Sequence, residues 1–206
     1  MRLLAKCVAT SFFLAAVGLV LTGSTSIQAK DKKKPELKVK VGDTAPTFES
    51  IDENGKTFKS TDFVGKKVVV LYFYPADFTG GCTKQACGFR DDYEKLSGSG
   101  VAVIGVSGDS PSTHKLFKAY HKLAFPLLAD EKGELAKTFG VEVKAGGKSP
   151  TIDADGKKGT ADRGVTIMRW TVVIDKAGKV ADIGEVPSAE NDSKRVAAII
   201  KKLESN

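Results

Sequence analysis

The sequence predicts an α/β domain, in which a central mixed β-sheet is flanked by helices and an N-terminal β-hairpin comes first. Two runs, 67–74 and 101–107, are almost wholly apolar and rich in β-branched and aromatic residues. Such runs are typical of strands buried on both faces. Segments of helical character follow them, over 79–96 and 111–123. Strands that alternate with helices indicate a sheet with parallel strands.

The remaining elements complete this pattern. The hairpin is predicted around Asn54-Gly55, because this dipeptide favours a tight turn between two strands. Ser110 and Pro111 suit the cap and first position of the helix over 111–123. Further along, we expect a strand over 125–128, a helix over 134–139, a long surface loop over 144–164, a strand over 165–174, a turn over 175–179, an antiparallel strand over 180–185 and a helix over 192–203. The order is compatible with a thioredoxin-like fold and with other small α/β sheets.

The positive charge is concentrated at the front of the chain. The net charge is +7, but residues 30–40 hold six lysines against two acids. Residues 41–206 hold 24 basic against 23 acidic side chains, so this body gives no electrostatic reason to expect a nucleic-acid partner. We expect residues 30–40 to be a solvated linker to a domain over 41–206. The alternative is that these lysines bind anionic lipid or nucleic acid.

Residues 1–29 have the order of a secretory signal peptide. Arg2 and Lys6 precede a mainly apolar stretch over 8–21, and small and polar residues follow as far as Ala29. We expect cleavage after Ala29, export to a periplasmic or extracellular location and no stable membrane insertion afterwards; an uncleaved anchor is the alternative. Cleavage would remove Cys7 and leave a mature chain with two cysteines, Cys82 and Cys87.

Cys82 is placed where a thiol gains reactivity. It comes shortly after the predicted strand 67–74, near the first turn of the next helix. Free backbone N–H groups and the helix dipole favour a thiolate there. Thr79 can bring a hydroxyl beside the sulfur, and Arg169 can add a permanent positive charge from a neighbouring strand. A buried, inert cysteine is the alternative for a single thiol.

The position of Cys87 supports a redox role for Cys82. Residues five apart on a helix are separated by about 7.5 Å along the axis and about 140° around it. A disulfide needs Cα atoms within about 6.8 Å, so an intact helix cannot hold a Cys82–Cys87 bond. The spacing favours a reversible cycle in which Cys82 forms a sulfenic acid, the helix frays beside Gly80-Gly81, and Cys87 attacks.

The motif Pro75-x3-Thr79-x2-Cys82 resembles the peroxiredoxin signature. The spacing from Cys82 to Cys87 is similar to that of the peroxiredoxin Q group, also called bacterioferritin comigratory proteins. The segments 105–114, 125–130 and 168–175 resemble further stretches of this group, and the likeness covers about 41–204.

The resemblance implies a thioredoxin-like fold and a thiol-dependent peroxidase. By this resemblance, Pro75 would shield the thiolate, Thr79 would position the peroxide and Cys82 would attack the peroxide. Cys87 would resolve the sulfenic acid as a disulfide, and Arg169 matches the family arginine. Hydroperoxides, including hydrogen peroxide, would be the substrate and a thioredoxin-like protein the reductant, with no metal or other cofactor. We expect a monomer or weak dimer.

Three features depart from the resemblance: Gln85 stands where many members carry Glu, the loop over 144–164 is long, and a signal peptide is atypical. Two alternatives remain open on the same scaffold. An exported thiol–disulfide oxidoreductase would need a C-x2-C pair, and a metal-delivery module would need a tighter cysteine pair with a ligating histidine. His114 and His121 lack a compact ligand pattern, and we expect His114 to be a capping or surface residue.

Overall fold

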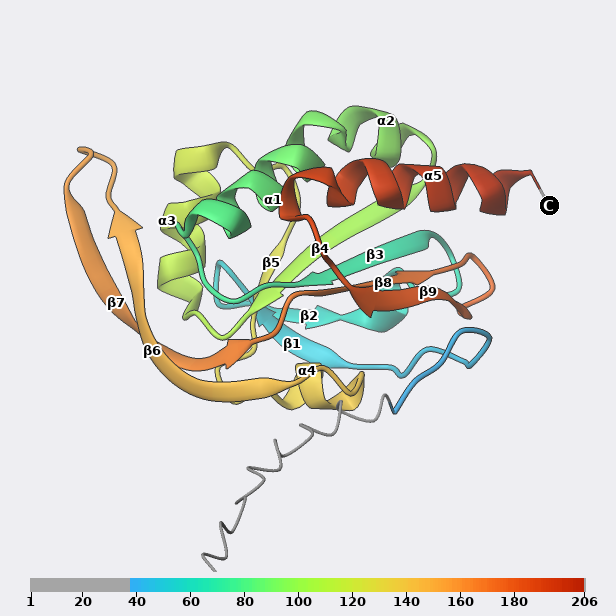
Figure 1. The fold of residues 1–206 in the computed structure, drawn as a ribbon, viewed down its shortest axis with the longest axis horizontal. Coiled ribbons are helices and arrows are strands. Elements are labelled where there is room, and N and C mark those ends of the chain that lie inside the picture. Colours follow the sequence, from blue (N-terminus) through green and yellow to red (C-terminus); the bar gives the residue numbers. More distant parts are fainter. Residues whose placement is uncertain (1–37, 206) are drawn as a thin grey trace, which may run out of the picture. The chain divides into compact units, whose positions relative to one another are not determined.

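The computed structural model describes residues 38–205 (Figure 1). The predicted signal peptide, with Cys7 and the cleavage position, therefore lies outside the described residues, as does most of the lysine-rich linker. Among the described residues, no helix is both long and apolar enough to cross a membrane. The predicted fold class is confirmed: a mixed sheet is flanked by helices, and a β-hairpin comes first.

Seven strands form the central sheet in the order β2-β1-β5-β4-β3-β8-β9. The three middle strands β3, β4 and β5 are parallel to one another, while β1, β8 and β9 pair antiparallel with their neighbours. The bounds are β1 Glu49–Asp52, β2 Thr57–Lys59, β3 Val68–Phe73, β4 Val101–Ser107, β5 Leu127–Ala129, β8 Trp170–Ile174 and β9 Val180–Glu185.

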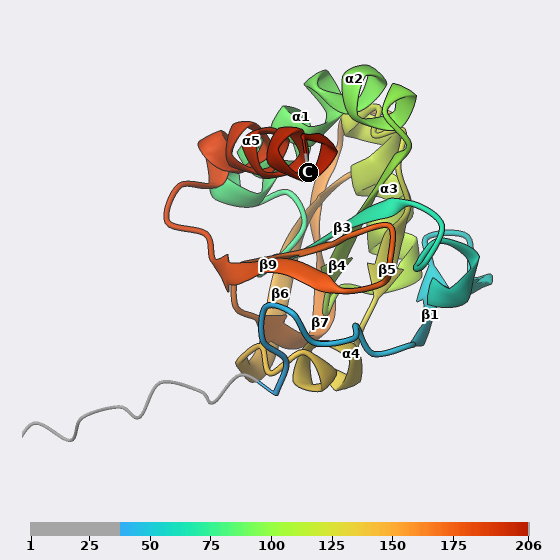
Figure 2. The same ribbon diagram turned by 90° about the vertical axis from the view of Figure 1, so that its right-hand side faces the viewer.

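The helices cover both faces of this sheet. Figures 1 and 2 show α1, α2, α3 and α5 on one face and α4 on the other. The bounds are α1 Gly80–Asp91, α2 Tyr93–Gly98, α3 Pro111–His121, α4 Glu134–Thr138 and α5 Asp192–Glu204, with single 3₁₀ turns at Ser60–Asp62 and Ala189–Asn191. Ser110 caps α3 through its side chain, as predicted, because its hydroxyl accepts the Thr113 N–H.

The core consists of two clusters, one on each face of the sheet. Alternate residues of β3 divide between them: Leu71 and Phe73 face the α4 side, whereas Val70 and Tyr72 face α1 and α5. All six residues of β3 are buried, which explains its continuous apolar sequence. Tyr72 stacks between Tyr74 and Phe89 in the second cluster, so both tyrosines are core residues.

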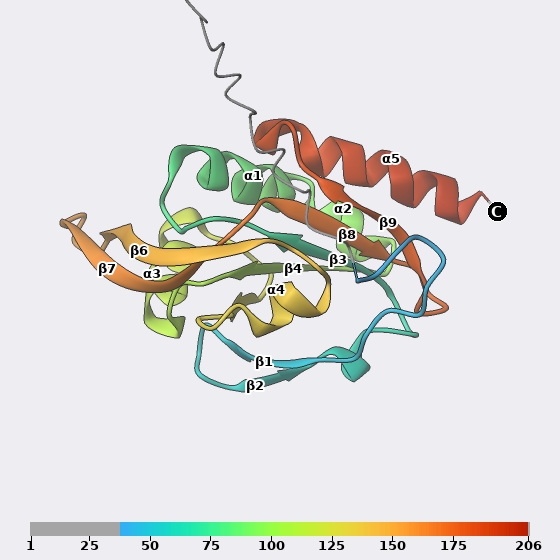
Figure 3. The same cartoon turned by 60° about the horizontal axis from the view of Figure 1, so that its bottom comes forward.

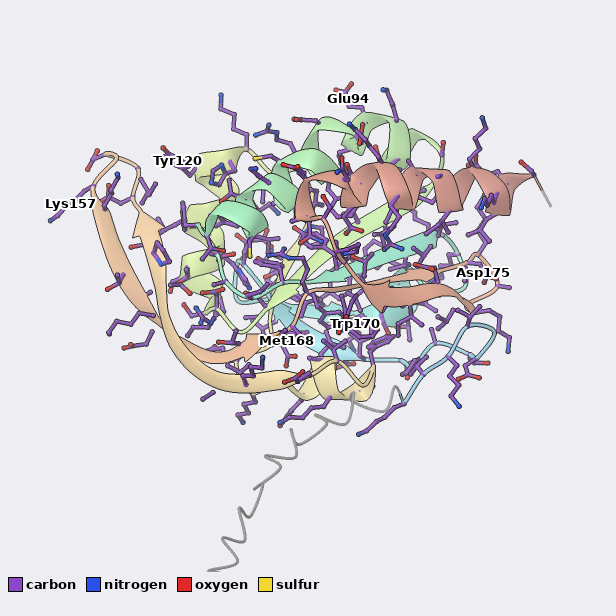
Figure 4. All side chains as sticks on the ribbon, viewed as in Figure 1. Glu94, Tyr120, Lys157, Met168, Trp170 and Asp175 are labelled. Atoms are coloured by element: carbon purple, nitrogen blue, oxygen red, sulfur yellow. The ribbon has the colours of Figure 1, made fainter. Side chains whose placement is uncertain are left out.

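The expectation of a long surface loop over 144–164 is wrong. These residues form a separate two-stranded antiparallel sheet, β6 Val143–Ile152 and β7 Lys158–Ile167, which curves away from the central sheet (Figure 3). Lys157 lies at its tip (Figure 4). Polar residues and glycines hide the strand pattern here, since most side chains of the hairpin are exposed or half-buried. Its pairing is continuous except at Gly146.

Three predicted boundaries also change. The helix expected over 79–96 is broken at Asp92 into α1 and α2. The strand expected over 165–174 is interrupted at Met168 and Arg169, so that β7 ends at Ile167 and β8 begins at Trp170. The strand expected over 125–128 begins only after Pro126, which has no N–H to donate to a neighbouring strand.

Candidate active site

Cys82 lies at the start of α1, at the point where the chain leaves the buried strand β3. It is the third residue of the helix, so it belongs to the turn whose backbone N–H groups lack partners within the helix. The residue is only 1% exposed and packs in the cluster between the sheet and α1. A buried sulfur that reacts as an anion needs a positive charge nearby.

Arg169 provides that charge. Its Nη2 donates to the Cys82 sulfur at 3.1 Å. The arginine occupies the break between β7 and β8, flanked by Met168 and Trp170 (Figure 4). Gly81 leaves room for it, because a Cβ atom at this position would lie 3.3 Å from Nη2. A thiolate at Cys82 would accept a charge-assisted hydrogen bond from a group that stays protonated at any ordinary pH.

A chain of buried polar groups holds the guanidinium in place. Nη1 of Arg169 donates to Oε1 of Gln85, and Nε2 of Gln85 donates to Oδ2 of Asp192 at 2.8 Å. The same carboxylate accepts the hydroxyl of Thr171 at 2.7 Å and Nε of Arg195 at 3.0 Å. An ionised carboxylate only accepts hydrogen bonds, so Asp192 fixes the Gln85 amide with its oxygen toward Arg169.

This arrangement explains the glutamine at position 85 and predicts that a glutamate there would destabilise the fold. Gln85→Glu would bury a second carboxylate against Asp192, and losing the charged hydrogen bond alone costs about 1.5–3 kcal/mol of unfolding free energy. Asp192→Asn in the same chain would restore a donor and recover part of this loss. Urea unfolding of both single variants and the double variant measures the coupling; purely additive losses would contradict the assigned amide orientation.

Thr79 and Pro75 lie in the loop between β3 and α1. Thr79 is the residue that precedes α1, and its hydroxyl donates to the carbonyl of Ala76 at 2.9 Å. Pro75 is half-buried near the start of the loop. Phe78 adopts the left-handed backbone conformation, with φ of 55°, which a bulky residue keeps only when its surroundings hold it there. Its ring packs against Phe117 at a centroid distance of 5.1 Å.

A buried pair, Asp77 and His114, anchors this loop to α3. Both side chains are fully buried, so the expectation that His114 caps a helix or lies on the surface is wrong. Nε2 of His114 faces the carbonyl of Leu128 at 3.1 Å and Nδ1 faces Oδ2 of Asp77 at 2.8 Å. The carbonyl can only accept, so Nε2 carries a hydrogen and a further proton lies between Nδ1 and Asp77. The hydroxyl of Tyr74 donates to the other oxygen of Asp77 at 2.7 Å.

Cys87 does not contact Cys82. Both cysteines are free and lie in the continuous helix α1, and Cys87 is half-buried on another side of that helix. Its sulfur lies 3.9 Å from Nδ1 of His121, at the end of α3. A disulfide between the two cysteines therefore requires the start of α1 to unwind, as the spacing predicts.

A surface cleft of about 430 Å³ lies beside Arg169, and a second of about 400 Å³ lies beside Cys87. Within residues 38–205, no group of three or more His, Cys, Asp or Glu side chains could hold a metal ion. Sequence reasoning missed Asp192, Asp77 and the contact of His121, which all depend on residues far apart in the chain. Only Gln85 has a local signal, since it lies one helical turn after Cys82.

Comparisons with known proteins show the family of the chain. The AhpC/TSA family matches residues 41–183. A chloroplastic peroxiredoxin Q from Populus jackii is 41% identical over 167 residues, covering 79% of this chain and 70% of that protein. A chloroplastic peroxiredoxin Q from Suaeda salsa is 53% identical over 104 residues, covering 50% of this chain and 48% of that protein.

Solved structures show the same fold. Peroxidoxin BcpB from Mycobacterium tuberculosis superposes with a TM-score of 0.66 and 31% identity, covering 80% of this chain and 97% of that one. A PrxQ structure from Xylella fastidiosa, at 23% identity, gives the same TM-score of 0.66 over 80% of this chain and 96% of that one. The resemblance seen in the sequence is thereby confirmed: the chain belongs to the AhpC/TSA family, in its peroxiredoxin Q group.

Proposed function

We propose that the protein is a thiol-dependent peroxidase that reduces hydrogen peroxide and organic hydroperoxides. The contact of the Arg169 guanidinium with the Cys82 sulfur, at the start of α1, carries this proposal. The thiolate of Cys82 attacks the terminal oxygen of the hydroperoxide, the O–O bond breaks, and the leaving oxygen takes a proton to give an alcohol or water. Cys82 becomes a sulfenic acid.

Positive groups favour this reaction because negative charge moves from the sulfur to the leaving oxygen. Arg169 and the free N–H groups of the first turn of α1 are fixed before the reaction, so they stabilise the developing charge without reorganising. We propose that Thr79 and Pro75, in the loop before α1, position the peroxide and exclude bulk water.

The thiol of Cys87 then attacks the sulfur of the sulfenic acid, which forms an intramolecular disulfide and releases water. A thioredoxin-like dithiol protein returns both cysteines to the reduced state. The continuous helix between the cysteines supports this cycle over a permanent disulfide. The described part of the chain has no C-x2-C pair, which a thiol–disulfide oxidoreductase would need. It also has no cysteine pair with a common ligating histidine, which a metal-delivery module would need.

Peroxide turnover tests this function. The purified protein with a dithiol donor is expected to consume hydrogen peroxide, whereas Cys82→Ser should fall to the rate without enzyme because the attacking sulfur is gone. Cys87→Ala keeps the first reaction and loses only the disulfide route for recycling. The assay follows peroxide loss over time, and retained consumption by Cys82→Ser would end the proposal.

We also propose that residues 1–29 are a targeting peptide, which directs export and is removed after Ala29. The order of basic, apolar and small residues supports this. The relatives from Populus jackii and Suaeda salsa are chloroplastic by name, so an organellar address is the competing destination. N-terminal sequencing of the protein from its native cell, together with its compartment, decides between them. We propose a monomer or weak dimer, which sedimentation measures.

A further inference from the structure

We propose that His121 is the base that activates Cys87, the thiol that resolves the sulfenic acid. This role rests on the proposed peroxidase cycle and adds a catalytic group to its second step. The observation that carries it is the contact between the Cys87 sulfur and Nδ1 of His121, at 3.9 Å. The contact joins α1 to the last residue of α3, so the fold brings together two groups that lie 34 positions apart.

The surroundings hold the imidazole in this position. Its ring packs edge-on against Phe117, at a centroid distance of 4.9 Å, and lies 5.7 Å from the ring of Phe78. Arg90, three residues after Cys87 on α1, donates from Nη1 to the carbonyl of His121 at 2.9 Å. Two attachments therefore keep Nδ1 facing the Cys87 sulfur while α1 is intact.

The charges around His121 favour its neutral, proton-accepting form. Burial and the nearby guanidinium of Arg90 lower the pKa of His121, so the imidazole is unprotonated at neutral pH. Cys87 and Arg90 face it from α1, Tyr120 and Lys122 flank it on its own segment, and the apolar ring of Phe78 packs against it from the loop before α1. The groups that shift the pKa of His121 include no carboxylate that would raise it.

The chemistry follows from the need for a thiolate. A thiol attacks sulfur only after it loses its proton, and Nδ1 of neutral His121 can take that proton from Cys87. The Cys87 sulfur then bonds to the Cys82 sulfur, the S–O bond of the sulfenic acid breaks, and the leaving hydroxide becomes water with the proton that His121 releases. The step consumes one thiol and one sulfenic acid and yields one disulfide and one water.

The order of events also fits. Cys87 meets His121 in the helical state, before the start of α1 unwinds, so the thiol can lose its proton where the base is held. The positive charge of Arg90 next to the imidazole opposes a long-lived imidazolium, which favours release of the proton once the disulfide forms.

The test separates the two steps of the cycle. The reduced protein is mixed with one equivalent of hydrogen peroxide, quenched in acid at set times and alkylated, and mass spectrometry counts the thiols, sulfenic acids and disulfides. His121→Gln should oxidise Cys82 at the normal rate and form the disulfide at least ~10-fold more slowly, as expected for loss of a general base. Tyr120→Phe is the matched control, since it keeps the ring contact with His121 and should change neither step.

The pH profile distinguishes a base from a packing residue. Disulfide formation in the native chain should rise with pH through the titration of His121 and then level off, and the plateau should disappear in His121→Gln. Equal resolution rates and profiles in the two proteins would overturn the proposal. Near-UV circular dichroism checks the packing, and His121→Asn serves as a second variant if His121→Gln folds poorly.

A second readout does not depend on peroxide. In Cys82→Ser, the rate at which iodoacetamide alkylates Cys87 should fall ~10-fold when His121→Gln is added. If the native chain fails to react with peroxide but this effect is present, the peroxidase is wrong and the pairing of Cys87 with His121 stands. If Cys82 is oxidised normally and the alkylation rate is unaffected, only the role of His121 is wrong.

Discussion

Arg169→Met is expected to slow the oxidation of Cys82 by peroxide about 10²–10³-fold, the usual cost of losing one fixed donor to developing charge. The substitution keeps a long apolar side chain and removes the guanidinium whose Nη2 lies 3.1 Å from the sulfur. In the proposed reaction, the attacking sulfur and the leaving oxygen would both lose the positive charge of Arg169. The second-order rate constant, from acid-quenched single turnovers, measures the effect.

Arg169→Lys grades this result. A lysine keeps the positive charge but lacks the planar guanidinium that donates to both the sulfur and the Gln85 oxygen. The rate of Cys82 oxidation in Arg169→Lys should therefore lie between the rates of the native chain and of Arg169→Met. The near-UV circular dichroism signal of the buried Trp170 shows whether strand β8 stays packed in the core. Native rates in Arg169→Met would mean that Arg169 has only a structural role.

His114→Gln is expected to lower the free energy of unfolding by about 3–5 kcal/mol, the range for a buried ion pair that loses one partner. It would leave the carboxyl group of Asp77 buried without its cation. The exposed pair Lys148–Asp162 offers the matched control, because Lys148→Gln breaks a salt bridge with side chains 67% and 87% exposed. Such a pair contributes only about 0–1 kcal/mol. Urea unfolding measures both losses, and similar values would contradict the account.

The pH dependence of stability has a definite sign. Burial alone would lower the pKa of His114, but the charge and hydrogen bond of Asp77 outweigh it and raise the pKa above its ordinary value. A raised histidine pKa means that the folded state holds its proton more tightly than the unfolded state. The pair therefore stabilises fully below about pH 6.5, and this contribution is lost as the pH rises through the folded pKa. His114→Gln should lack this loss.

The same pair has a consequence for the site. The N–H of Asp77 donates to Asp109 at 2.9 Å, and Asp109 in turn accepts the hydroxyls of Ser107 and Ser149. Ser149 lies on β6, so the hairpin over 143–167, α3 and the loop before Cys82 share one buried polar network. A loop fixed on both sides can hold the strained backbone of Phe78 and the start of α1 in one position.

Turn chemistry shows why one hairpin was missed. The pattern Asp-x-x-Gly-Lys begins at Asp52, Asp153 and Asp175, and at each place the aspartate side chain accepts two backbone N–H groups. The sequence indicates turns at the first, where Asn54-Gly55 favours a hairpin, and at the third, which follows the apolar strand β8. At the second, lysines and glycines flank it and the strands face mostly solvent, so hydrophobic periodicity is absent.

The residues proposed to react have a local sequence signal, whereas the residues that support them do not. Cys82 and Thr79 lie close in sequence at a strand-to-helix junction, where helix geometry alone indicates the environment of the thiol. The link from Gln85 to Asp192 joins α1 to α5 over 107 positions, and no local pattern encodes it. His114 is expected from the sequence to cap a helix or lie on the surface, because no local pattern indicates its buried partner Asp77.

Identifying the atom that takes up the peroxide oxygen tests the central claim most directly. When Cys87→Ser is treated with one equivalent of hydrogen peroxide, the account predicts a mass gain of about 16 daltons, the oxygen of a sulfenic acid, on the peptide that contains Cys82. In the native chain the same treatment should instead remove about two daltons and link Cys82 to Cys87. Oxygen on a different residue, or an unmodified Cys82 after peroxide has been consumed, would contradict the account.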